Sequence, residues 1–438
     1  MRLYSNPQSV TNGKSRIKDI LIVLLMFLFI YYPPIITVNT LHILAVISYV
    51  YILSKSYLIS TVQKEFHNFG FILFIFFYLS IVCILTGNMT NSLGTFVWFF
   101  EVIPIAYMLV DMIQKNKSEN RTASVWNYLI AAGMLQAGIS IFAFAVPSFQ
   151  SIIIQRMLAY GFKDVVLKMS GHRMYGFSYT MAFAMPVVQA ILAAACVYKA
   201  FVKNIAYMIA APLLLFSSII NARVGLVVFL ISFIIALFAS AKISFKNIVA
   251  LCIICVMIFW IPKLFTHFLQ GTKTFDWLET GITSITDFIF ENDTSGEYIN
   301  YATNAEKYRV PSGISFFFGT GNISTRGNIN YASDVGFIND MWLGGIFYII
   351  PLLFYFIKRT YQMTEFYYLK NSFKNVSGII TVIMFLLVNI KGRCFSWNEI
   401  TNLWFLIYTF MITFDLYEQK GCDDFENAEG NSCDSTLQ

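Results

Sequence analysis

The chain has 438 residues, of which 57% are hydrophobic and only 12% are charged, and its mean hydropathy is +0.65. Soluble domains carry roughly 25% charged residues, so this composition excludes a water-soluble fold. The apolar runs follow one another closely, which favours one helical bundle over several soluble domains. We therefore expect an all-α integral membrane protein, with one transmembrane domain over residues 1–421.

Runs of about 18 to 23 mostly apolar residues are long enough to cross a hydrocarbon core of roughly 30 Å. The first run lacks a small-residue cleavage site and should act as an uncleaved anchor. In chain order, the expected spans lie near residues 19–37, 40–58, 68–86, 93–113, 125–146, 177–198, 204–221, 224–241, 247–266, 335–357, 376–391 and 399–417. The sequence therefore predicts about twelve transmembrane helices.

The basic residues test this topology, because cytoplasmic loops carry an excess of Lys and Arg. More than half of the 30 basic residues fall in segments assigned to the cytoplasm, and every assigned cytoplasmic loop holds at least two. Both chain ends are then cytoplasmic, and the acidic tail 422–438 should be disordered. Two long loops, 147–176 and 263–334, face outward, and these are where chemistry could take place.

The second outer loop contains apolar residues at helical spacing, from Trp277 and Leu278 to Ile289. This pattern predicts a short helix at the membrane surface, which either caps the bundle or grips a substrate as a lid. A glycine-rich stretch, 319–327, follows it before the tenth span. The cysteines do not indicate a disulfide framework, and Cys252 and Cys255 lie in an apolar run where we expect no metal.

Some arginines lie in predicted outer segments, although Lys and Arg are usually enriched in cytoplasmic loops. Arg173 comes just before the sixth span, Arg223 lies in a very short turn after Asn221, and Arg393 lies in the tight last outer turn. Arginine suits phosphate because its planar fork donates two parallel hydrogen bonds and stays charged. These three helix ends predict guanidinium groups at one depth that bind an anion.

Other charged residues have weaker claims. Arg309 and Arg326 of the second outer loop are further anion-binding candidates, whereas Arg156, Lys163 and Lys273 fit ordinary solvating charges.

Two carboxylates and two histidines complete the candidate set. Glu101 and Asp340 lie inside predicted spans, where a carboxylate is a functional candidate by default, although a structural salt bridge to an arginine is equally credible. His172 and His267 face outward and could act as bases near pH 7, or could be polar surface. His42 and His67 are assigned no role.

Three motifs resemble those of a known membrane family. They are His172-Arg173-Met-Tyr-Gly176, then Asn221-Ala-Arg223-Val-Gly225, and finally Phe317-Phe-Gly319-Thr-Gly321 followed by Ser333-Asp334-Val-Gly336 and Gly344-Gly345-Ile346. In their order and membrane side these motifs resemble the Wzy-type O-antigen polymerases, which are related to the O-antigen ligases among the GT-C-type membrane glycosyltransferases. With the topology, the resemblance covers about residues 20–415.

The resemblance implies an inverting glycosyltransferase in the bacterial inner membrane that joins undecaprenyl-diphosphate-linked glycans at the periplasmic face. It implies no metal, cofactor, nucleotide sugar or nucleic acid, and it makes a chain-length regulator protein a candidate partner. Related ligases carry a histidine where this chain has Ser333 and Asp334, which favours a polymerase. Asp334 is then the preferred base, with His172 in reserve, and the structural alternative for Asp334 is a cap on the tenth helix.

Two other functions remain open. An O-antigen ligase would share the same fold and substrate chemistry. A lipid-linked-glycan flippase would also have about twelve spans, but transporters of that kind are usually built from repeats. The outer loop 263–334 argues against a flippase.

Overall fold

The computed structural model describes residues 13–35, 38–68, 70–116, 121–161, 172–181, 183–202, 206–239, 273–280, 304–323, 333–365, 388–393 and 398–413, with a few single residues between these ranges. Within them every regular element is helical and no strand occurs. The all-α prediction is confirmed for this part of the chain.

The described residues do not support twelve full-length spans. One helix in them is long and apolar enough to cross a membrane by itself, namely Val125–Ala145 within α6 (Arg121–Ala145), with 21 residues and a hydropathy of 1.7. The predicted span 247–266 and most of 376–391 lie outside the described residues. The number twelve therefore stays a prediction.

Several helices do occupy expected apolar runs. These are α1 (Gly13–Tyr31), α4 (Gly70–Leu85), α5 (Met89–Asn116), α6, α10 (Tyr207–Ile219), α11 (Val224–Ala239) and a helix over residues 399–413. Hydrophobic length is a local property, so it predicts the position of such elements well.

The chain bends sharply inside the predicted span 40–58. α2 (Thr40–Leu53) is capped at Ser54, whose N–H donates to the Val50 carbonyl at 3.1 Å. The next helix, α3 (Ser56–Asn68), departs at 114°. The prediction of one continuous helix here is wrong because α3 is amphipathic and carries polar residues that do not suit a membrane interior.

The predicted span 335–357 is likewise two helices, α16 (Gly336–Gly344) and α17 (Ile346–Glu365). Gly345 separates them with φ +68, a conformation that glycine adopts without steric cost. The break leaves the Trp342 and Leu343 carbonyls available, and the N–H groups of Thr320 and Gly321 donate to them at 2.7 and 3.0 Å. Backbone from the glycine-rich stretch therefore replaces the missing helical hydrogen bonds.

The sixth predicted span, 177–198, begins later than expected. α9 (Ala184–Val202) starts at Ala184, and the preceding residues are irregular. Part of the reason is tertiary: the Thr180 N–H donates to the Glu399 carboxylate at 2.8 Å rather than into a helix. A buried carboxylate thus contributes to the late start of this helix.

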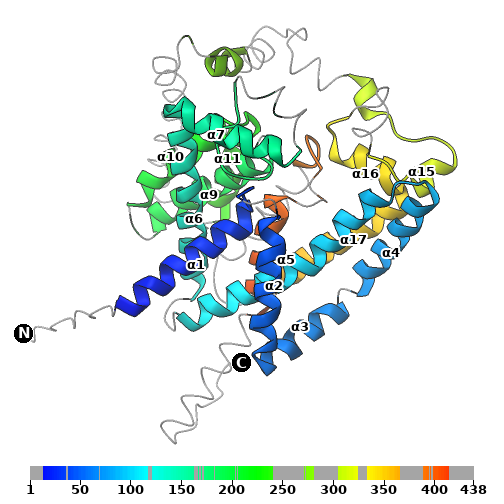
Figure 1. Ribbon diagram of the computed structural model, residues 1–438, viewed down its shortest axis with the longest axis horizontal. Helices are drawn as coiled ribbons and strands as arrows, with labels where there is room; N and C mark the ends of the chain where they lie inside the picture. The colour runs from blue at the N-terminus through cyan, green and yellow to red at the C-terminus, as the bar shows by residue number, and fades with distance from the viewer. Residues whose placement is uncertain are drawn as a thin grey trace, which may run out of the picture.

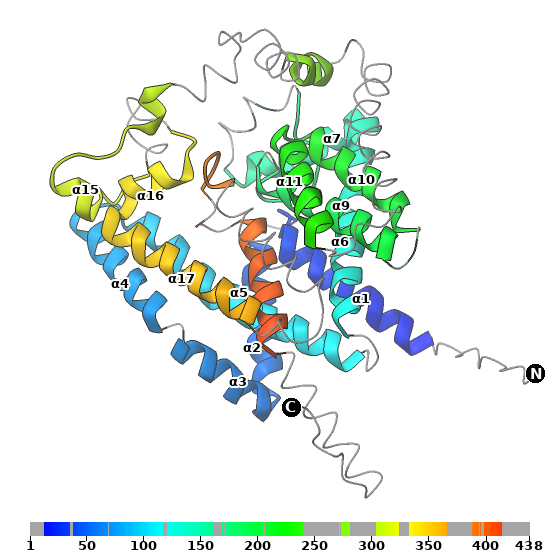
Figure 2. The ribbon, with the colours of Figure 1, turned by 180° about the vertical axis from the view of Figure 1, so that it is seen from behind.

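The helices form two groups, which Figures 1 and 2 show from opposite sides. One group contains α1, α6, α7 (Pro147–Ala159), α9, α10 and α11, and the other contains α4, α15 (Ile314–Phe318), α16 and α17. α2 and α5 lie between them, and so does the helix 399–413, drawn in orange. We call these the α9 group and the α17 group.

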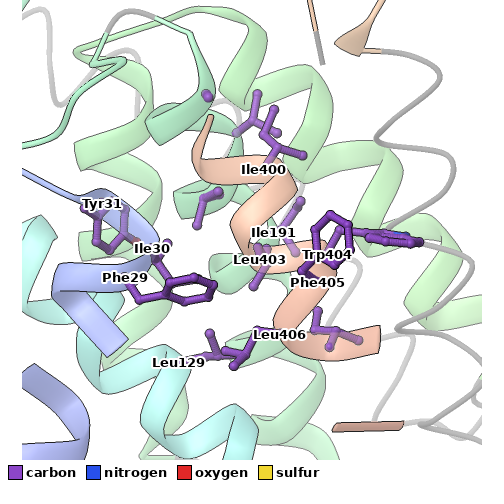
Figure 3. Close-up of a cluster of buried hydrophobic side chains, with 14 of the residues drawn as sticks. Phe29, Ile30, Tyr31, Leu129, Ile191, Ile400, Leu403, Trp404, Phe405 and Leu406 are labelled. Carbon is purple, nitrogen blue, oxygen red and sulfur yellow. The ribbon is translucent and has the colours of Figure 1, made fainter. Parts of the chain in front are cut away.

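The helix 399–413 joins the core of the α9 group. Leu403 and Trp404 are buried together with Phe29 of α1, Leu129 of α6 and Ile191 of α9 (Figure 3). Asn402 also donates to the Phe29 carbonyl at 2.9 Å. Side chains from four separate segments thereby meet in one apolar cluster.

The surface of the α17 group carries apolar stripes. α4 and α17 contact one another, and each exposes large apolar residues at helical spacing. These residues, which are 53% to 68% exposed, are Phe74, Phe77 and Ile81 on α4 and Ile350, Phe354 and Ile357 on α17. Polar side chains such as Asp111 and Gln189 are, in contrast, fully buried. Soluble proteins rarely expose apolar stripes of this size.

Candidate functional site

Two of the predicted arginines meet at one tryptophan. The guanidinium carbon of Arg223 lies 4.4 Å from the centroid of the Trp277 ring, and that of Arg173 lies 5.4 Å from the same centroid. The His172 ring is 5.8 Å from it, and Arg223 also donates to the Trp277 carbonyl. We call His172, Arg173, Arg223, Lys273 and Trp277 the arginine cluster.

Asn221 joins the two segments that carry these arginines. Its side chain accepts a hydrogen bond from the Tyr175 N–H at 2.8 Å and donates one to the Tyr175 carbonyl at 2.7 Å. A third hydrogen bond runs to the Ser217 carbonyl of α10 at 2.9 Å, and Asn221 is fully buried. An amide can satisfy a backbone donor and acceptor at once. Asn221 thus determines the position of Arg173 relative to Arg223.

The turn beside Arg173 is strained. Met174 is buried and has φ +84, a region that non-glycine residues seldom adopt. Such a conformation costs of order 1–3 kcal/mol and persists where the surroundings impose it, most often at functional sites. The Asn221 hydrogen bonds to Tyr175, the next residue, supply that constraint.

Trp277 belongs to the predicted surface helix, which the structure shows over residues 273–280. It is drawn in green above α7 and α11 in Figure 1. Thr274 and Leu278 are its buried residues, and Thr274 shares a hydrogen bond of 2.8 Å with the Tyr175 hydroxyl. The rest of the predicted helix, from Ile282 to Ile289, lies outside the described residues. The described part includes Trp277, whose ring lies against Arg173 and Arg223.

The arginine cluster combines a neutral histidine with positively charged side chains. Partial burial lowers the pKa of His172 below its ordinary value, and the positive charges of Arg173, Arg223 and Lys273 lower it further. His172 is therefore neutral near pH 7 and able to accept a proton. The arginines stay charged at any relevant pH. A neutral base beside several cations suits a reaction in which an anion forms and a proton leaves.

Arg393 lies elsewhere, against α16. Its Nε donates to Asp340 Oδ1 at 2.5 Å, and the Asp340 side chain is fully buried. The side-chain contacts described for Arg393 are with Asp340 and Tyr348, so the described residues do not join it to Arg173 and Arg223 as the sequence predicted. For Asp340 the structure shows the structural alternative that the sequence left open, a salt bridge to an arginine.

Glu101 also has a partner, but it is not an arginine. Its carboxylate lies 2.6 Å from His42 Nδ1, and the pair joins α5 to α2. The sequence assigned no role to His42, because a histidine near the end of a span has no local pattern. The Glu101 and His42 pair lies in the helices between the two groups.

Asp334, the preferred base from the sequence, is exposed just before α16. It lies near Lys307, because its carboxylate opposes the lowering of the Lys307 pKa that burial causes. The first residue before α16 is Val335, and no side chain caps this helix, so the capping alternative for Asp334 is wrong. In Figures 1 and 2, α16 lies within the α17 group, whereas the helix 273–280 lies above the α9 group.

The remaining candidates divide by position. Arg309 is exposed, and its carbonyl accepts a hydrogen bond from Trp342 Nε1 of α16 at 2.9 Å. Like Asp334, it therefore lies near α16. Arg326 and His267 lie outside the described residues.

Glu399 is a further residue that sequence reasoning missed. It is fully buried and accepts hydrogen bonds from Ser178 Oγ, Thr180 Oγ1 and the Thr180 N–H. It therefore ties the helix 399–413 to the segment that follows Arg173. The rule that selected Glu101 and Asp340, a carboxylate within a predicted span, would also have found it.

Comparison with known proteins adds no relative. No protein-family model matches the chain, and no curated protein matches it. Any functional assignment therefore rests on the residues and contacts described above.

Proposed function

We propose that this chain is a membrane glycosyltransferase that polymerises undecaprenyl-diphosphate-linked repeat units into O-antigen polysaccharide at the periplasmic face of the bacterial inner membrane. One observation carries the proposal: Arg173 and Arg223, from segments far apart in the chain, lie over the same indole ring of an outer-loop helix. Such a pair suits a ligand that carries two linked phosphates.

The proposed step uses this geometry in a simple way. A hydroxyl oxygen of the acceptor glycan attacks the anomeric carbon of the donor, and the bond from that carbon to the diphosphate oxygen breaks. The bonding electron pair stays on the diphosphate, whose negative charge grows. Preorganised guanidinium groups stabilise charge that develops in a transition state, and losing one such donor typically costs about 10²–10³-fold in rate.

The hydroxyl proton needs a base within hydrogen-bonding reach. The contacts favour His172 over Asp334, since His172 lies in the arginine cluster, whereas Asp334 lies beside Lys307 just before α16. His172 is also in the form that accepts a proton near pH 7, because its pKa is lowered. Attack from the face opposite the diphosphate inverts the anomeric configuration.

Membrane insertion is part of the proposal. The exposed apolar stripes on α4 and α17, together with the buried Asp111 and Gln189, support a lipid-facing exterior, because they reverse the usual arrangement of a soluble protein. The composition and the charge alternation of the loops support it independently. The number of spans, about twelve, belongs to the same proposal.

Deleting the gene and examining the lipopolysaccharide on a gel tests the function. A missing polymerase leaves a single repeat unit on the lipid core and no longer ladder. A missing ligase leaves bare core with polymer on the lipid carrier, and a missing flippase leaves no periplasmic glycan. An unchanged ladder, or either of the latter two patterns, contradicts the proposal.

A further inference from the structure

Trp277 makes several different contacts with one group of residues. Its ring lies under both guanidinium groups, its carbonyl accepts from Arg223, and the His172 ring packs beside it. No motif in the sequence linked this residue to the arginines. The 54 residues that separate Arg223 from Trp277 mean that only tertiary folding brings them together.

The contact with the ring constrains the arginines without consuming their donors. Cation–π attraction acts between the positive charge and the ring face, whereas the five N–H donors of arginine point outward in the guanidinium plane. Arg223 also donates to the Trp277 carbonyl, so Trp277 holds this side chain through both its ring and its backbone. A free arginine side chain would have to lose much of its rotational freedom on binding.

The helix that carries the Trp277 ring is itself anchored to the bundle. The helix 273–280 is joined to the bundle by the hydrogen bond of 2.8 Å between Thr274 and Tyr175, and by the buried Leu278. Tyr175 is the same residue whose backbone is bound by Asn221. One connected set of contacts thus determines the positions of the tryptophan and both arginines.

We infer that Trp277 is a positioning residue that presents Arg173 and Arg223 together to one diphosphate group. This inference rests on the proposed function, because it takes the two arginines as the diphosphate ligands. The indole orders both side chains before the ligand arrives, so that less entropy is lost on binding. Its role is distinct from catalysis, since it acts through the arginines.

Binding of a soluble analogue to the purified full-length protein in detergent tests this role. The probe is farnesyl diphosphate, and its dissociation constant is measured for wild type and variants by calorimetry. Trp277→Leu removes the π face and should weaken binding about tenfold, whereas Trp277→Phe keeps a ring and should weaken it about threefold or less. Thr280→Ala, on the exposed side of the same helix, is the matched control and should bind as wild type does.

The possible outcomes separate the two ideas. If Arg173→Ala and Arg223→Ala abolish binding while Trp277→Leu binds as wild type does, the positioning role is wrong and the proposed function stands. If Trp277→Phe is as weak as Trp277→Leu, the ring face is not what matters and the positioning role is also wrong. If wild type does not bind farnesyl diphosphate, or if both arginine variants bind normally, the proposed function fails. Thermal melting of each variant identifies any loss that comes from unfolding.

Discussion

Two arginine sites of the molecule use the side chain in opposite ways. Against α16 of the α17 group, Arg393 donates to Asp340, whose side chain is fully buried, and the charges are matched inside the protein. In the α9 group, the contacts described for Arg173 and Arg223 are with the ring and carbonyl of Trp277, and these side chains are half-buried. A buried carboxylate neutralises an arginine, whereas a ring orders it and leaves it charged. The comparison fits a structural ion pair at Arg393 and supports the proposed ligand site at Arg173 and Arg223.

The largest expected effect separates the two base candidates. His172→Gln should reduce polymer by about 10²–10⁴-fold, the usual contribution of a general base, while Asp334→Asn should leave most of it. The ladder on a lipopolysaccharide gel, with protein levels checked by immunoblot, measures both. A lost ladder in Asp334→Asn with an intact ladder in His172→Gln would reverse the assignment.

The same comparison predicts a pH dependence. A base must be unprotonated to act, so the rate of polymerisation in vitro should fall as the pH drops through the pKa of His172. Burial and the neighbouring cations lower that pKa below 6.5, so the acid limb should lie below pH 6.5. An acid limb above pH 7 would contradict this role for His172.

The next largest effect concerns Arg393. Arg393→Ala leaves Asp340 buried without its partner, which costs about 3–5 kcal/mol, so the protein should be lost from the membrane fraction. The double variant Arg393→Ala with Asp340→Asn removes the uncompensated charge and should recover much of the protein. Immunoblots of membrane fractions measure both. Normal levels of the single variant without polymer would instead assign Arg393 to the ligand site.

The arginines of the cluster should behave differently from Arg393. Arg173→Ala and Arg223→Ala should each lower polymer by about 10²–10³-fold at normal protein level, because they remove charge stabilisation rather than a structural pair. Lysine should rescue poorly, since a point charge lacks the bidentate geometry. Arg156→Ala, exposed on α7, is the control and should keep the ladder. Loss of the Arg173 and Arg223 variants from the membrane would give them a structural role.

The smallest effect tests the break between α16 and α17. A Cβ at Gly345 would contact the Phe317 carbonyl, and φ there is +68, so Gly345→Ala should lower stability by about 1–3 kcal/mol. Gly138→Ala on α6, where a Cβ meets nothing within 4 Å, is the control and should be neutral or slightly stabilising. Melting temperatures in detergent report both. Equal melting temperatures for Gly345→Ala and the wild type would mean that the glycine at this break does not contribute to stability.

Local sequence predicted the helices better than their ends. α4, α10 and α11 follow the apolar runs, because hydrophobic length depends on nearby residues alone. The expected span 177–198 begins late because Glu399 binds the Thr180 N–H, and the span 335–357 breaks because backbone from 320–321 reaches the α16 carbonyls. In both cases a partner distant in the chain changes where a helix ends.

The sequence by itself determined an apolar helical chain with Arg173 and Arg223 at the ends of apolar runs, since composition and short motifs are local properties. Only the tertiary structure decided that Trp277 lies under both of them, and that Arg393 pairs with Asp340 instead. The hydrogen bonds and ion pair that make these choices join residues 46 to 54 positions apart. Such pairings depend on how whole helices pack, because a side chain contacts whatever the packing brings within a few ångströms, and no local pattern specifies that partner.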